Sequence, residues 1–523
     1  MRLLLVEFFR GALRRNERSM LFPFLQGLAR ERGAGTLWLC YGGDVAHRDG
    51  AEVGRTLHAS LPPEDLRSLS RRLESFRPTH VVTSDPLGPE ARALLAARAP
   101  RAQRLVMPVA GELDDLARCG WFLEWLGLEE PASARRYLVE RAVPDYAAVL
   151  ANGAARSATP QITVVGGALC AYRVPLAGNP HFAGVDLGAS GHRGCSFCTC
   201  ATMPPLSSPR ALPLPLVETQ LRRVLETAGR GGRDKGRYEF FDIRAFWAFD
   251  ELIALVLRLR LPPSIFLFNP RIDDVLRGRG RIEKVLPALA KAGHEVRLLS
   301  MGVENFSERE NTRFNKRITL AQVDEFLAMT KDWGRRFPGV FRPFKDGRAA
   351  AELGFILFTP WTTLADLRVN LEAAAARGFP ECGYWLYSVL LIEEKTPLFL
   401  LAREDGVLAG EFPDKGQYYG LFKNEGELRE VRAWRFKDAR VAGLFAALVR
   451  FSAAEREGAS CSHFRGDPLF AAAARLHRET NAPPDGKASP LGVAFALLEL
   501  LEAPAPRPSG EALLREAVAR AAA

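Results

Sequence analysis

Two successive series of strand-like and helix-like segments constrain the fold of this 523-residue chain most strongly. In the first series, apolar runs rich in β-formers alternate with segments in which apolar residues recur at helical spacing. Strands are predicted at 2–8, 36–41, 79–83 and 104–109, and helices at 20–32, 63–76 and 89–97. Because strands that alternate with helices through short connections pair in parallel, this pattern predicts an α/β fold. We expect a Rossmann-like, doubly wound parallel sheet over residues 1–115.

The second series is longer and predicts a different parallel architecture. Strands are predicted at 182–187, 238–242, 264–268, 295–301, 354–358 and 383–391, and helices at 216–228, 250–259, 282–292, 320–330 and 364–376. This repetition is typical of a full or partial (β/α) barrel of the TIM type, whose catalytic groups lie at the carboxyl ends of the strands. We therefore expect a connector at 116–180, a barrel at 181–424 and a C-terminal helical region at 425–523, with the last residues loosely held.

Composition excludes several classes of protein. The net charge of +10 arises from 71 basic and 61 acidic residues that are interspersed, so no nucleic-acid groove is expected. No apolar run reaches the roughly 20 residues needed to cross a bilayer. The first residues lack the features of a signal peptide, so we expect a cytoplasmic protein with reduced thiols. The 8 cysteines are also too few for a disulfide scaffold.

Three of these cysteines lie within six residues, on a glycine-rich loop. Cys195, Cys198 and Cys200 follow the predicted strand at 182–187. Three unrelated buried thiols are one explanation. A structural zinc site is another, since Cys195 and Cys198 have C-x2-C spacing and Cys461 with His463 would complete four ligands. An iron-sulfur cluster needs only three protein thiolates if one iron stays open to a small molecule. The sequence favours the cluster.

Motifs in a shared order along 182–400 resemble the radical S-adenosylmethionine (SAM) superfamily. The matching stretches are 193–201 (RGCSFCTCA), 239–242 (EFFD), 268–271 (FNPR), 300–305 (SMGVEN), 314–319 (FNKRIT), 354–362 (GFILFTPWT) and 394–399 (EKTPLF). One departure is clear. The family spaces its cysteines C-x3-C-x2-C, whereas this chain has C-x2-C-x-C.

The resemblance implies cofactors and roles for individual residues. Cys195, Cys198 and Cys200 would hold a [4Fe-4S] cluster whose fourth iron binds SAM, and reduction would cleave SAM to a 5′-deoxyadenosyl radical. Thr199 stands where the family has a residue near the adenine. The SAM amine would be held by Glu239 or Asp242. The turn of Gly302 and Glu304 would contact the ribose or the amino-acid part of SAM.

The N-terminal sheet in front of such a barrel resembles the cobalamin-binding branch of the superfamily. Gly42, Gly43, Thr83 and Ser84 at the strand ends would then receive the corrin or its tail. The implied function is cobalamin-dependent methylation of an unactivated carbon. A cobalamin-free radical enzyme and a non-catalytic or zinc-stabilised binding protein remain the alternatives.

The same resemblance implies two partners. An electron donor such as a flavodoxin or ferredoxin would reduce the cluster. The substrate would be a small molecule or a peptide. Trp361, Trp385 and Tyr387 lie near the predicted barrel mouth, where they either line a pocket for that substrate or pack in the core.

Overall fold

The fold was analysed in a computed structural model of the chain. The residues described are 1–9, 21–42, 61, 63–83, 87–106, 120–140, 145, 161–164, 172–188, 192–198, 214–228, 236–240, 246–298, 301–341, 353–381, 384–393, 396–409, 434–457, 464, 466–481, 488–504 and 510–522. Helices and parallel strands dominate them, so the chain is a helix-rich α/β protein, as the alternating pattern predicts.

A four-stranded parallel sheet begins the chain. Its strands are β1 (Arg2–Phe9), β2 (Gly35–Gly42), β3 (His80–Thr83) and β4 (Gln103–Val106). Their order in space is β2-β1-β3-β4. The first strand pairs with β2 on one side and with β3 on the other, so the direction of winding reverses between β1 and β3. Ligands of such sheets bind beyond the carboxyl ends of the strands at that point.

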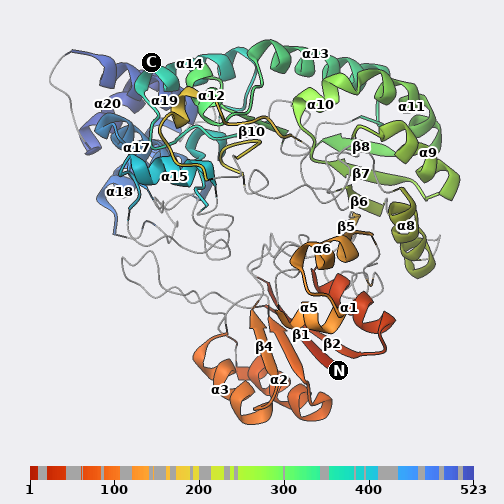
Figure 1. Ribbon diagram of the computed structural model, residues 1–523. Coiled ribbons are helices and arrows are strands. Elements are labelled where there is room, and N and C mark those ends of the chain that lie inside the picture. The colour runs from red at the N-terminus through yellow and green to blue at the C-terminus, as the bar shows by residue number, and fades with distance from the viewer. Residues whose placement is uncertain are drawn as a thin grey trace.

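Both faces of this sheet are covered by helices (Figure 1). One apolar cluster joins alternate β1 residues, Leu3 and Leu5, to α1 (Leu21–Glu31), α5 (Gly120–Leu126) and α6 (Pro131–Glu140). The other joins Leu4 and Val6 to α2 (Pro63–Phe76) and α3 (Pro89–Arg98). Because successive side chains of a strand point to opposite faces, a strand with apolar residues at every position buries both faces.

The middle of the chain forms two more parallel sheets. The larger contains β5 (Gln161–Val164), β6 (Gly236–Phe240), β7 (Ser264–Phe268) and β8 (Glu295–Leu298) in sequence order, and the smaller contains β9 (Met301–Glu304) and β10 (Leu353–Phe355). Eight helices of this region are α8 (Leu214–Ala228), α9 (Phe249–Leu259), α10 (Ile272–Arg277), α11 (Arg279–Ala292), α12 (Glu308–Arg313), α13 (Leu320–Arg336), α14 (Leu364–Ala376) and α15 (Pro397–Glu404).

Local sequence signals set the start of the long helices here. Thr319 caps α13 and Thr363 caps α14, each in a reciprocal capping box with the residue three positions on, Gln322 and Asp366. Such a box satisfies backbone N–H groups that a helix start leaves without partners. The two boxes fix where the chain enters each helix.

The C-terminal helices continue the same apolar core. They are α17 (Ala439–Glu457), α18 (Pro468–Asn481), α19 (Pro490–Glu502) and α20 (Gly510–Ala522), and Figure 1 shows them in blue beside α14. The prediction of loosely held final residues is wrong, because Leu513, Leu514, Ala517 and Val518 of α20 are buried. Their spacing of three and four residues forms one apolar helix face.

One predicted strand is also wrong. The segment 182–187 is not a strand: it starts in a 3₁₀ turn, Pro180–Phe182, and Gly184 has a left-handed backbone with φ of 83°. Its expected place beside β6 is taken by β5, within the segment expected to be the connector. The prediction for 383–391 is right in part: the segment contains the 3₁₀ turn η6 (Tyr384–Tyr387), and Val389 then forms a parallel β-bridge with Phe358.

No helix among the described residues is both long and apolar enough to cross a membrane.

Candidate functional site

Two of the three cysteines on the glycine-rich loop lie among the described residues, and they differ in burial. Cys195 is buried and Cys198 is half-buried. The Cys198 amide donates to the Cys195 carbonyl oxygen at 3.2 Å, so the two residues form one tight turn. Thr199 and Cys200 lie outside the described residues. Two of the three predicted thiolate ligands are thus brought together on one turn.

The segment that follows α12 holds this loop in place. The Ser196 amide donates to the Phe314 carbonyl at 3.0 Å, and the Ser196 hydroxyl donates to the Arg313 carbonyl at 2.6 Å. Asn315 Nδ2 donates to the Gly194 carbonyl at 2.8 Å. The ring of Phe197 packs edge-on against Phe314, with centroids 5.4 Å apart. The loop is therefore attached to the 313–316 segment by backbone and side chains alike.

Arg271 approaches the buried thiol from the carboxyl end of β7. Its Nη1 donates to the Sγ of Cys195 at 3.6 Å, and its Nη2 donates to the Lys316 carbonyl at 3.0 Å. The guanidinium also lies 3.7 Å from the ring centroid of Tyr172. Only 5% of Arg271 is exposed. A buried arginine therefore contacts the sulfur of the first predicted ligand.

A buried ion pair completes the site. Lys316 Nζ donates to Glu304 Oε1 at 2.8 Å, and their side chains are 8% and 11% exposed. Glu304 ends β9 with a positive φ of 67°. A Cβ atom on Gly302 would overlap the Glu304 carboxylate and lie 2.7 Å from Lys316 Nζ, so the ion pair occupies the space that glycine leaves. Glu304, predicted to contact SAM, is held here by a lysine.

Burial and charge act in opposite directions on the thiol. Burial raises the pKa of Cys195, because it penalises the thiolate, while the Lys316 ammonium and the Arg271 guanidinium partly offset this rise. Burial is the largest single influence on the pKa of Lys316 and lowers it, but the Glu304 carboxylate and the Cys195 sulfur together raise it by more and leave this pKa above its usual value. The two cations favour a thiolate, or a thiolate-bound group, at Cys195.

This donor set suits an iron-sulfur cluster. Clusters are bound by thiolates, and a net negative cluster is stabilised by buried cations and by hydrogen bonds to its sulfurs. No group of three or more His, Cys, Asp or Glu side chains is placed to bind a metal among the described residues. Cys200, Cys461 and His463 lie outside those residues, so neither the third thiolate nor the zinc alternative is tested.

Of the two residues predicted to hold the SAM amine, Glu239 and Asp242, the structure describes one. Glu239 lies in β6 between two core residues, Tyr238 and Phe240, so its side chain points to the face away from the aromatic core shared with α9. Asp242 lies outside the described residues. Of the two candidate partners of the SAM amine, Glu239 is therefore the one whose position is described.

The predicted cobalamin residues lie at neighbouring strand ends. Thr83 ends β3 and is buried, and it pairs with Val6 of β1, so it lies where the winding reverses. Gly42 ends β2, opposite Phe9. Gly43 and Ser84 lie outside the described residues.

The predicted aromatic pocket residues are core residues. Trp361, Trp385 and Tyr387 are buried in the central apolar cluster, and the Trp385 indole donates to the Pro380 carbonyl at 3.0 Å. Of the two explanations for these rings, core packing is the one that the structure supports.

Sequence reasoning missed Arg271, Lys316 and Tyr172 as site residues. Arg271 follows the predicted strand at 264–268, so a cation at a strand end was a usable signal for it. Lys316 belongs to a motif stretch too, but it follows α12 and not a strand. Tyr172 had no such signal. Its hydroxyl donates to the Asn315 carbonyl at 2.6 Å, and burial raises its pKa to about 12.

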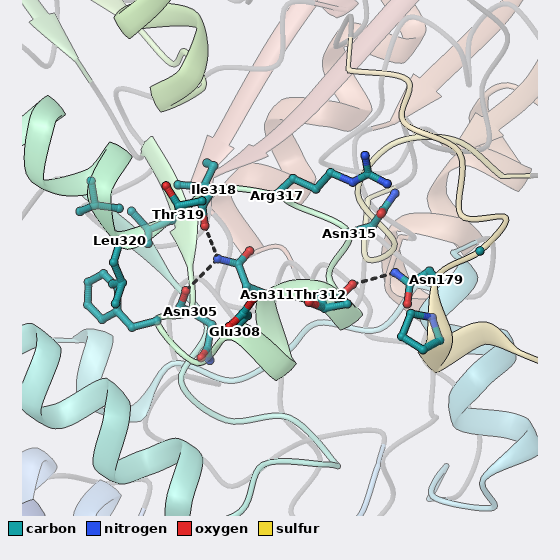
Figure 2. A pocket seen from close by; sticks show the side chains of 15 residues that line it. Asn179, Asn305, Glu308, Asn311, Thr312, Asn315, Arg317, Ile318, Thr319 and Leu320 are labelled. Atoms are coloured by element: carbon teal, nitrogen blue, oxygen red, sulfur yellow. Dashed lines mark hydrogen bonds between the residues drawn. The ribbon is translucent and has the colours of Figure 1, made fainter.

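A cavity of about 560 Å³ lies beside α12 (Figure 2). Cys195, Arg271, Glu304 and Lys316 do not line it. Two of the asparagines that line it donate hydrogen bonds to backbone carbonyls. Asn179 Nδ2 donates to the Thr312 carbonyl at 2.7 Å, and Asn311 Nδ2 donates to the Ile318 carbonyl at 2.8 Å. We therefore place the candidate site at the thiols and not in this cavity.

Comparison with known proteins finds similarity in structure but none in sequence. No protein-family model and no curated sequence matches the chain. The cobalamin-dependent S-adenosylmethionine radical enzyme OxsB, with aqua-cobalamin and S-adenosylmethionine bound, is similar with a TM-score of 0.53 and 14% identity. That match covers 96% of this chain and 71% of OxsB. The apo, selenomethionine-labelled OxsB structure gives a TM-score of 0.53 and 14% identity, over 96% and 72% of the two chains.

The likeness extends over nearly the whole chain, N-terminal sheet included. It agrees with the resemblance that the order of the motifs indicates. The chain thus has the fold of a cobalamin-dependent radical SAM enzyme.

Proposed function

We propose that this protein is a radical SAM enzyme that holds a [4Fe-4S] cluster on Cys195, Cys198 and Cys200. In this proposal the N-terminal sheet is a doubly wound cobalamin domain, and the middle sheets belong to a partial (β/α) barrel. The observation that carries the proposal is the buried Cys195 thiol beside Arg271 and Lys316. It lies next to the residues that follow β7 and β9, where enzymes with parallel sheets keep their reactive groups.

The chain's own residues have separable tasks in this scheme. The bound cluster supplies one low-potential electron that cleaves SAM to a 5′-deoxyadenosyl radical. The three thiolates bind the cluster. Glu239 or Asp242 accepts a charge-assisted hydrogen bond from the SAM amine. Glu304 holds the Lys316 ammonium in place and, through it, the charge beside Cys195.

The test is anaerobic reconstitution with iron and sulfide. We expect an absorbance band of an iron-sulfur cluster and reductant-dependent cleavage of SAM to 5′-deoxyadenosine. A triple Cys195→Ala, Cys198→Ala, Cys200→Ala variant should lose both. The control is Cys40→Ala, which removes a thiol of β2 outside the loop and should keep both. SAM cleavage by the triple variant would overturn the proposal.

Cobalamin-dependent methylation of an unactivated carbon is the finer proposal, and its support is the fold shared with OxsB. The corrin would lie beyond Thr83 and Gly42, at the ends of β3 and β2. Hydroxocobalamin should bind in a one-to-one ratio and should protect the N-terminal region from proteolysis. Without such binding, a cobalamin-free radical enzyme becomes the better assignment.

The partners follow from the same chemistry. A flavodoxin or ferredoxin would supply the electron, and the substrate would be a small molecule or a peptide. The competing proposal is a zinc-stabilised binding protein, and metal analysis distinguishes the two. Stoichiometric zinc without iron in protein purified under anaerobic conditions would favour the zinc protein.

A further inference from the structure

Arg271 is the most firmly held cation at the site. Three nitrogen atoms of its guanidinium each have a different partner: Nε donates to Asp273 Oδ1 at 2.9 Å, Nη2 to the Lys316 carbonyl at 3.0 Å, and Nη1 to the Sγ of Cys195 at 3.6 Å. The Tyr172 ring packs against the guanidinium plane at 3.7 Å. Only 5% of Arg271 is exposed, so these contacts lie in the close-packed interior.

Its charge is directed at the sulfur. Asp273, the carboxylate that pairs with Arg271, contacts Nε, whereas Nη1 faces the thiol. The second buried cation, Lys316, is paired with Glu304 instead. Arg271 is therefore the cation with a described N–H···S contact to a predicted cluster ligand, and its position does not depend on solvent.

A hydrogen bond from Arg271 to the Cys195 sulfur would affect the free energy of adding an electron to a cluster bound there. Hydrogen bonds to the sulfurs of an iron-sulfur cluster, the net charge around it and its exposure set its reduction potential. Reduction adds one negative charge, and a fixed cation in a region of low dielectric stabilises that charge more than an exposed cation does. A radical SAM cluster must accept an electron before it can act, so this energy controls whether the enzyme is primed.

Resting on the cluster assignment of the proposed function, we infer that Arg271 is a positioning residue that raises the reduction potential of the cluster through its hydrogen bond to Cys195. The step is a transfer of one electron from a low-potential donor to the iron-sulfur core. No bond forms or breaks, and no proton moves. Tyr172 and Asp273 hold the guanidinium in the geometry that this requires.

The experiment measures the cluster potential without SAM or substrate. Full-length protein is reconstituted anaerobically and titrated with dithionite and mediator dyes, and the reduced cluster is followed by electron paramagnetic resonance (EPR). The variants are Arg271→Gln, which removes the charge, and Arg271→Lys, which keeps it without the planar fork. The matched control is Arg279→Gln at the start of the next helix, α11, whose side chain is 52% exposed and pairs with Glu283. Iron and sulfide contents are measured for every sample.

We expect Arg271→Gln to bind the cluster and to lower its one-electron reduction equilibrium about tenfold, a shift of about 59 mV to lower potential. Arg271→Lys should fall between wild type and Arg271→Gln, and Arg279→Gln should match wild type because water and salt screen its charge. If Arg271→Gln holds no cluster, the Arg271→Lys potential decides.

Three outcomes overturn the inference. They are an unchanged potential in a fully loaded Arg271→Gln, an equal shift in Arg279→Gln, and loss of the cluster from both Arg271 variants. The last would make the arginine an assembly residue. Failure of the proposed function is distinguishable, because the wild-type protein itself would then bind no cluster.

Discussion

Two buried ionic networks involve α12 and the segment that follows it, and they differ in what they contact. Along the helix, Glu310 accepts hydrogen bonds from Arg313 and from the Thr359 hydroxyl, and Asp366 accepts from Arg309 and from the Ser307 hydroxyl. These contacts join α12 to α14 and to the turn that follows β10. After the helix, Lys316 pairs with Glu304 beside Arg271 and the Cys195 thiol.

The difference separates structural from functional use of buried charge. In the first network, each carboxylate oxygen of Glu310 and Asp366 accepts a hydrogen bond from a protein group, and the network encloses no reactive atom. In the second, the cations adjoin a sulfur that can become a ligand. Burial of charge alone therefore does not indicate a reactive site, and the proposed site rests on the thiol that the buried cations adjoin.

The largest predicted effect is on the first network. Glu310→Ala would leave the buried Arg313 without a counter-charge, and breaking a buried pair in this way costs about 3–5 kcal/mol of unfolding free energy. Urea unfolding of the cluster-free protein measures it. The control Glu308→Gln, exposed on the same helix, should change stability by less than about 0.5 kcal/mol. A small effect of Glu310→Ala would mean that this network is not structural.

Breaking the Lys316–Glu304 pair should cost less unfolding free energy than breaking the Glu310 network, but it should also affect the cluster. Lys316→Met leaves the Glu304 carboxylate without its cation, and we expect a loss of about 3 kcal/mol, at the low end for a broken buried pair, because the Glu304 side chain is 11% exposed whereas that of Glu310 is 0% exposed. The double variant Glu304→Gln, Lys316→Met should recover part of that loss. We also expect slower cluster assembly in Lys316→Met, measured by absorbance. Equal assembly rates in Glu310→Ala and Lys316→Met would remove the distinction between the two networks.

Gly302→Ala probes the second network without changing a charge. The added Cβ meets the Glu304 carboxylate and Lys316 Nζ, and such overpacking costs about 1–3 kcal/mol. Thermal unfolding measures the loss. The matched control is Gly443→Ala, an exposed helical glycine of α17 with nothing within 4 Å of its added Cβ. This control should gain about 1 kcal/mol. A neutral Gly302→Ala would show that the ion pair is free to move aside.

The smallest loss of unfolding free energy is expected from breaking an exposed ion pair. Arg368 of α14 pairs with Glu502 of α19, with side chains 34% and 33% exposed. Arg368→Met should lose less than about 1 kcal/mol, and the loss should shrink in high salt because water and ions screen the pair. A loss that salt leaves unchanged would place this pair with the buried networks.

The sequence predicted the parts of the fold that depend on local pattern. Strand β7 and helices α2 and α14 occupy the predicted residues, because their apolar periodicity is strong and their ends carry turn or capping residues. The strand at 182–187 failed because Gly184 turns the chain there. The segment 383–391 was predicted in part: Val389 bridges in parallel to Phe358, but the apolar run before it forms a buried 3₁₀ turn, which such a run fits as well as a strand.

The candidate site was predictable only in part. The thiols and Glu304 stood out as residue types in a recognisable order. The Arg271–Cys195 contact joins residues 76 positions apart, and no local pattern encodes it. Likewise, the pairing of Glu304 with Lys316 depends on how the chain folds back after α12.

The central claim is that Cys195, Cys198 and Cys200 hold a cluster with one iron open to SAM. EPR of the reconstituted, dithionite-reduced protein with and without SAM tests it most directly. We predict about four irons per chain and a reduced-cluster signal that changes when SAM is added. Protein without such a signal, or with a signal that SAM leaves unchanged, would contradict the claim.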